Sequence, residues 1–130
     1  MRRVLILICF LCLGISTALA QDPAKVSPNT HKVLLENDRV RVLDVRVQPG
    51  KKVPTHSHPD YVIYALSDFK VKFTYPDGKT AELDGKAGDA SWREAETHAA
   101  ENVGTRELHV LNIELKGVAK KASPAKKKTM

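Results

Sequence analysis

Two histidines, His56 and His58, are the residues of this chain best placed to do chemistry. They stand one residue apart at the head of an apolar run, and on an extended strand residues i and i+2 point to the same side. Neutral imidazole is a good ligand for zinc, iron, manganese, nickel and copper, and a third histidine would complete an open three-ligand face. His98 is the candidate for that third ligand, but spacing alone does not bring it near the pair.

The elements that must position these histidines are predicted to be β-strands almost throughout. No segment offers three uninterrupted turns of helical periodicity, whereas short β-branched or alternating runs are separated by turn signals such as Pro76-Asp77-Gly78. In one run the apolar parity slips between Val42 and Leu43, which predicts a bulge or a strand covered on both faces. Seven or eight short strands favour an all-β sandwich or barrel. The predicted strands include 31–36, 40–47, 69–75, 80–83, 90–93 and 107–115, the last with His109, Leu111, Ile113 and Leu115 on one face.

The two ends of the chain differ in composition from the middle. Residues 1–20 combine Arg2 and Arg3 with a short apolar stretch and a small-residue cleavage pattern, which predicts a signal peptide cleaved after Ala20; an uncleaved anchor is the alternative. We therefore expect a periplasmic or secreted protein. Both cysteines lie in that segment, so the mature chain would have neither a disulfide nor a cysteine-based metal site.

Residues 21–30 are interpreted as an N-terminal linker, 31–115 as a single domain, and 116–130 as a disordered tail. The tail holds six lysines and no acidic residue, whereas residues 21–115 hold 13 basic and 15 acidic residues. The tail could make weak contacts with an anionic surface or be a solubilising extension. No aromatic residue is interleaved among its lysines, so specific nucleic-acid binding is not expected.

Two motifs in this order resemble those of the cupin superfamily. Gly50, followed after five residues by His56-x-His58 and a hydrophobic strand, is similar to the first cupin motif. Gly88-Asp89, then Trp92 and His98-x-x-x-Asn102, is similar to the second, which in cupins supplies the third histidine. The resemblance spans about residues 33–115 and implies a single-domain jelly-roll β-barrel. It also implies a divalent metal held in the interior by His56, His58 and His98.

The chain departs from the cupin pattern at the fourth metal ligand. Cupins commonly carry a glutamate a few residues after the paired histidines, whereas this chain has Tyr61 in that slot with Asp60 beside it. Tyr61, Asp60, Glu96 and Trp92 are therefore candidates for a fourth ligand or for the pocket wall. Trp92 is expected in the core more than at a ligand. Glu94 and Glu96 could carry protons or belong to a solvated loop.

Four further residues have weaker claims on the site. His31, just before the first strand, is expected at the surface. His109 is expected to be a hydrogen-bonded core residue rather than a metal ligand. Glu101 and Asn102 could orient the metal-binding histidines, or they could stabilise turns.

Three functional hypotheses remain open at this stage. The first is an exported cupin that binds one metal and a small oxygen-bearing ligand or substrate; as an enzyme it would resemble cupin dioxygenases, isomerases or decarboxylases, an analogy of fold only. The second is a non-catalytic ligand-binding or sensing module without metal. The third is a barrel that functions through pairing as a homodimer, since a small barrel leaves apolar edge surface to cover.

Overall fold

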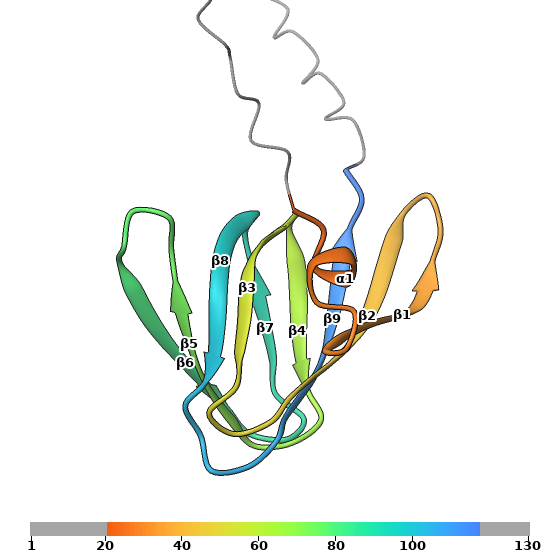
Figure 1. The fold of residues 1–130 in the computed structure, drawn as a ribbon. Helices are drawn as coiled ribbons and strands as arrows, with labels where there is room; N and C mark the ends of the chain where they lie inside the picture. Colours follow the sequence, from red (N-terminus) through yellow and green to blue (C-terminus); the bar gives the residue numbers. More distant parts are fainter. Residues whose placement is uncertain (1–20, 118–130) are drawn as a thin grey trace, which may run out of the picture.

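The computed structural model describes residues 21–117, and these form two antiparallel β-sheets that face each other (Figure 1). The predicted signal peptide and all of the predicted tail except Lys116 and Gly117 lie outside the described residues. The five-stranded sheet has the order β1-β2-β9-β4-β7 and the four-stranded sheet the order β3-β8-β5-β6. The elements are α1 (Pro23–Val26), β1 (His31–Glu36), β2 (Val40–Val47), β3 (Lys52–His58), β4 (Tyr61–Ala65), β5 (Phe69–Thr74), β6 (Thr80–Gly85), β7 (Ala90–Arg93), β8 (Glu96–Asn102) and β9 (Leu108–Leu115).

The core fills the space between the sheets, and alternation along each strand supplies it. In β4, for example, Tyr61, Ile63 and Ala65 are buried, whereas Val62 and Tyr64 lie outward. Large apolar side chains from both sheets complete the core: Leu43, Val45, Val47, Val53, Val71, Phe73, Leu108 and Val110. The all-β, jelly-roll prediction is confirmed.

Turn chemistry fixes several corners of the barrel. Gly78 has φ 85° in the predicted hairpin turn between β5 and β6, a conformation that side chains with a Cβ rarely adopt. Between β1 and β2, the Asn37 side-chain oxygen accepts hydrogen bonds from the backbone N–H groups of Arg39 and Val40. The predicted bulge is present, but in the partner strand: the register shifts between Val33 and Leu35, opposite the Leu43–Val42 step.

Two segments differ from the sequence-based expectation. Residues 21–30, expected as a linker, include the helical turn α1, which contacts β1 and β3 and buries Pro23. In β9 the inward residues are Leu108, Val110, Asn112 and Glu114, so His109 and its apolar neighbours lie on the outer face. His109 is hydrogen-bonded, as expected, to Asp44, with 2.6 Å between its Nε2 and the carboxylate.

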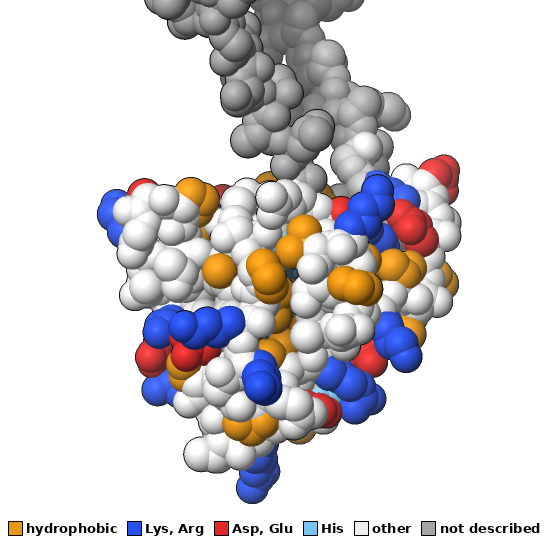
Figure 2. Space-filling view, in the orientation of Figure 1, with side chains coloured by type: hydrophobic (Ala, Val, Ile, Leu, Met, Phe, Trp, Pro, Cys, Tyr) orange, Lys and Arg blue, Asp and Glu red, His pale blue; other side chains and the backbone are white. Residues whose placement is uncertain are grey.

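The barrel surface carries both signs of charge. Figure 2 shows Lys and Arg side chains close to Asp and Glu side chains on the viewed face. Ion pairs of the described residues include Lys70–Glu82 (2.9 Å) and Lys72–Glu101 (3.1 Å). Within residues 21–117, no helix is long and apolar enough to cross a membrane.

Candidate metal centre

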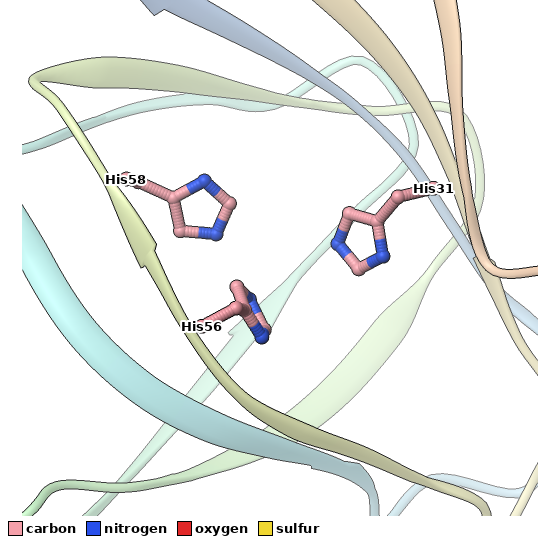
Figure 3. Close-up of side chains that lie close together, drawn as sticks. All are labelled: His31, His56 and His58. Carbon is pink, nitrogen blue, oxygen red and sulfur yellow. The ribbon is translucent and has the colours of Figure 1, made fainter. Parts of the chain in front are cut away.

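Three buried histidines from two strands lie close together inside the barrel (Figure 3). His56 and His58 project from β3, as the i, i+2 spacing predicts, and His31 projects from β1 in the opposite sheet. Each offers one ring nitrogen, and these three nitrogens all lie within 4.8 Å of one another. The three rings are therefore grouped as a set of nitrogen donors for one metal ion.

Hydrogen bonds to each Nδ1 atom leave the same nitrogen, Nε2, available in all three rings. His56 Nδ1 lies 2.7 Å from the Pro54 carbonyl oxygen, which can only accept a hydrogen bond. His58 Nδ1 lies 2.7 Å from Glu114 Oε1, which can only accept when the carboxylate is ionised. His31 Nδ1 lies 2.8 Å from Thr30 Oγ1, a hydroxyl that can donate or accept and that also contacts Ser27. The network thus assigns the proton to Nδ1 and the lone pair to Nε2 in His56 and His58.

Burial keeps His31 and His56 in the neutral form that binds metals. It lowers the pKa of His31 from 6.5 to about 3, with a further contribution from the neighbouring histidines. It lowers the pKa of His56 to about 4, although the hydrogen bond to Pro54 acts in the opposite direction. Both rings are neutral at pH 7 and need lose no ring proton to become ligands.

A buried carboxylate, Glu114, links the histidines to the N-terminal segment. Its Oε1 accepts from His58, and its Oε2 accepts from Arg41 Nε at 2.7 Å. Arg41 Nη1 in turn donates to both carboxylate oxygens of Asp22, at 3.0 and 2.9 Å. Burial would raise the pKa of Glu114, but the bonds from His58 and Arg41 lower it below its ordinary value. Glu114 is therefore an anion that holds the His58 ring in place.

His98 lies beside this group but is not one of its three members. Its ring centroid is 5.0 Å from that of His56 and 5.4 Å from that of His58, and its ring stacks on Phe73 at 4.1 Å. Its Nδ1 is buried without a hydrogen-bond partner, 3.6 Å from Glu96 Oε1. The predicted trio of His56, His58 and His98 is thus brought together in the barrel, while the ring nitrogens that lie closest together belong to His31, His56 and His58.

The four candidates for a fourth ligand or pocket wall occupy different environments. Tyr61 is buried, stacks on His58 at 4.5 Å, and donates its hydroxyl to Glu96 Oε1 at 2.7 Å. Glu96 also accepts two bonds from Arg93, at 2.9 and 2.7 Å. Burial would raise the pKa of Glu96, but its contacts with His98, Arg93 and Tyr61 lower it well below its ordinary range. Tyr61 therefore contacts His58 of the candidate site directly, and Glu96 contacts Tyr61.

Asp60 and Trp92 are outside this environment. Asp60 is exposed and accepts the backbone N–H of Ala95, which stabilises the approach to β8. Trp92 is 55% exposed on β7, so the expectation that it lies in the core is wrong. Asn102 stabilises a turn, since it donates to the carbonyls of Val47 and Arg106 and accepts from Gly104.

Two residues of the site escaped the sequence-based prediction. His31 was expected at the surface but is only 4% exposed, because the start of β1 pairs with Val45 and turns its side chain inward. Glu114 stands in an alternating strand whose other face is apolar, so its parity suggested solvent. The available signal was that Asn112 and Glu114 share a face of β9 with the apolar Leu108 and Val110.

A cavity of about 40 Å³ adjoins the histidines, and its remaining lining is mostly apolar. His31, His56, His58 and His98 all contribute to its wall, together with the side chain of Asn112. Asn112 is 5% exposed and its Oδ1 has no hydrogen-bond partner. Two unpaired polar atoms, this oxygen and His98 Nδ1, thus belong to residues that line the same cavity.

Comparison with known proteins gives a clear result for structures only. No protein-family model matches the sequence, and no curated protein sequence is significantly similar to it. A cupin domain from Bordetella pertussis Tohama I is 27% identical, with a TM-score of 0.61 over 67% of this chain and 92% of that chain.

Two further solved structures share the fold at lower identity. A conserved protein with a double-stranded β-helix domain from Klebsiella pneumoniae is 21% identical, with a TM-score of 0.55 over 78% of this chain and 93% of that chain. An RmlC-like cupin from Methanocaldococcus jannaschii is 15% identical, with a TM-score of 0.52 over 66% and 78%. With two facing antiparallel sheets and histidines inside them, this protein is a small cupin-domain protein.

Proposed function

We propose that the protein binds one divalent transition metal through His31, His56 and His58 and presents it to a small oxygen-bearing ligand. The observation that carries the proposal is the common hydrogen bonding of the three rings, in which every Nδ1 is engaged. Three imidazole nitrogens in one buried group match the ligand preference of zinc, iron, manganese, nickel or copper.

Three protein nitrogens leave coordination positions open for another molecule. A bound metal would supply a Lewis acid at that point. The adjoining cavity has room for roughly three water molecules, since one water needs about 10–15 Å³. We therefore expect a ligand of a few non-hydrogen atoms. Asn112 Oδ1 would accept a hydrogen bond from it, and His98 Nδ1 would be its other polar neighbour.

A ligand-binding module without metal is the second candidate, and the same unpaired atoms favour it. Asn112 Oδ1 and His98 Nδ1 are buried polar groups whose hydrogen bonds a small polar molecule could complete without any ion.

We further propose that the protein is exported to the periplasm or secreted, on the basis of the segment 1–20. A purified protein that begins at Gln21 is the expected mark of that processing.

Metal analysis of the parent protein and of single variants tests the ligand set. The parent, incubated with each candidate metal and desalted, should retain close to one ion per chain. His31→Ala should lower the affinity at least about 100-fold, because it removes one of three donors. His98→Ala should change it less than about tenfold.

His109→Ala is the matched control, because His109 lies on the outer face of β9 and bonds to Asp44. It should leave metal content unchanged. If the parent retains no metal at any concentration tested, the metal-free module is correct. If His98→Ala loses the metal while His31→Ala keeps it, the ligand set is the one predicted from the sequence motifs.

A further inference from the structure

The inward face of β5 runs from the histidines to one end of the barrel. Phe73 and Val71 are buried, and the Phe73 ring stacks on His98 at a centroid distance of 4.1 Å. Phe69, two residues before Val71, faces the same way but is only partly buried. All three residues of β5 line the cavity that adjoins the histidines. The strand thus leads from the candidate metal centre to the point on the surface where it begins.

Two hollows in the outer surface share Phe69 with this cavity. One, of about 300 Å³, lies among the connections between β4 and β5, β6 and β7, and β8 and β9. The other, of about 190 Å³, lies between β6 and β7, the last strands of the two sheets. Among residues 21–117, Phe69 alone lines the cavity and both of these hollows.

The Phe69 ring lies against a glycine that lines both hollows. Phe69 pairs with Gly85 across β5 and β6. A Cβ atom at Gly85 would fall 2.6 Å from Phe69 Cε1, nearer than a Cβ atom approaches another side chain in folded proteins. The absence of a side chain at Gly85 therefore leaves room for the ring beside the backbone of β6. The ring is the side chain that separates the hollows from the cavity.

The opposite end of the barrel is covered by the N-terminal segment. His58 and Phe69 lie toward opposite ends of the four-stranded sheet, as the pairings of β3 and β5 with β8 require. At the His58 end, the Ser57 N–H donates to the Gln21 carbonyl at 2.8 Å, and Pro23 of α1 is fully buried. The three connections around the larger hollow gather at the other end (Figure 1). A small molecule therefore has its shorter way to the cavity on the Phe69 side.

From this arrangement we infer that small ligands reach the candidate metal centre past Phe69, and that movement of its ring sets the rate of their entry and exit. The inference rests on the proposed function, because it concerns access to the cavity beside His31, His56 and His58. A side chain that controls passage changes the barrier in both directions. Substitution of Phe69 should therefore change association and dissociation rates together and leave the equilibrium affinity nearly constant.

Azide binding to the cobalt(II)-loaded protein measures this passage, because azide that joins cobalt(II) changes its visible absorption. In stopped-flow experiments Phe69→Ala should raise both rate constants at least about tenfold, while the dissociation constant changes less than about threefold. Phe69→Leu should act in the same direction if Phe69→Ala folds poorly. Tyr64→Ala is the matched control, because it truncates an exposed aromatic side chain on the outer face of β4. It should leave both rate constants unchanged.

Xenon is a second probe that needs no metal, because it binds in apolar cavities. Xenon NMR of the metal-free protein should show faster exchange in Phe69→Ala than in the parent. A parent that retains no cobalt would contradict the proposed function, and xenon exchange would then decide the role of Phe69. Equal rates in Phe69→Ala and the parent would overturn the inference. So would an Asp22→Ala variant that admits the probe faster than Phe69→Ala, because the route would then pass the N-terminal segment.

Discussion

At the residue scale, the candidate metal centre depends on groups that do not face the metal position. Thr30, the Pro54 carbonyl and Glu114 each hold one Nδ1 atom, and they belong to three different segments. Each imidazole therefore has a fixed ring orientation before a metal arrives, and acceptor-only partners also fix the tautomer of His56 and His58. Among these three partners only Glu114 carries a charge, so its substitution should be the most informative.

Glu114→Gln should weaken metal binding about 10–100-fold, as loss of a ligand's hydrogen-bond partner commonly does. An amide cannot offer two anionic oxygens to His58 and Arg41, so the metal-free protein should also lose about 1–3 kcal/mol of unfolding free energy. Competition with a chelator measures the first effect and denaturant titration the second. Glu101→Gln, which removes only the surface pair with Lys72, should leave both values near those of the parent. Unchanged metal affinity in Glu114→Gln would show that the carboxylate does not position His58.

Part of this site could be predicted from the sequence, and the reason is local geometry. His56 and His58 share a face because strand residues alternate, whatever the rest of the fold does. His31 enters the site only through the pairing of β1 with β2, which turns its side chain into the barrel. That placement depends on a register between distant residues, which no short motif records.

At the element scale, the strands were predictable but their inner faces were not always so. In β4 a single apolar alternation marks the core side. In β9 both faces are largely apolar, because Leu111, Ile113 and Leu115 lie outward opposite Leu108 and Val110. Alternation alone then cannot distinguish interior from exterior. The error in β9 thus arises because both of its faces are largely apolar.

The N-terminal segment is the element that the sequence described least well. Asp22 accepts the Ala24 backbone N–H at the start of α1 and also pairs with Arg41 at 2.9 Å. The Gln21 carbonyl accepts the Ser57 N–H at 2.8 Å, between the two histidines of β3. A polar, proline-containing segment lacks a helical pattern, so these long-range contacts could not be predicted from it.

Asp22→Ala should destabilise the protein by about 1–2 kcal/mol, because it removes both the helix cap and one partner of Arg41. Denaturant titration measures the change. Asp38→Ala, in the exposed turn between β1 and β2, is the control and should stay within about 0.5 kcal/mol of the parent. Equal stability of the two variants would mean that the Asp22 side chain adds nothing to the stability of the barrel.

At the scale of the whole molecule, three buried imidazoles in one barrel make folding sensitive to acid. Burial lowers the pKa of His31 to about 3 and of His56 to about 4, and it also lowers the pKa of His98. In the unfolded chain these groups take up protons near pH 6.5. Below that pH the unfolded state therefore binds protons that the folded state does not, and stability must fall as the pH falls.

For the metal-free protein, each such histidine should lower the unfolding free energy by about 1.4 kcal/mol per pH unit below about pH 6, until the pH approaches its folded-state pKa. Denaturant titrations between pH 7.5 and 4.5 measure the slope. His31→Gln should reduce the slope by about one proton, because glutamine does not titrate. A flat profile from pH 7.5 to 5 would contradict neutral, buried histidines. With metal bound, the unfolding free energy should fall more steeply as the pH falls, because protons then compete with the ion for the same nitrogens. This difference would connect the stability of the barrel to the occupancy of its metal site.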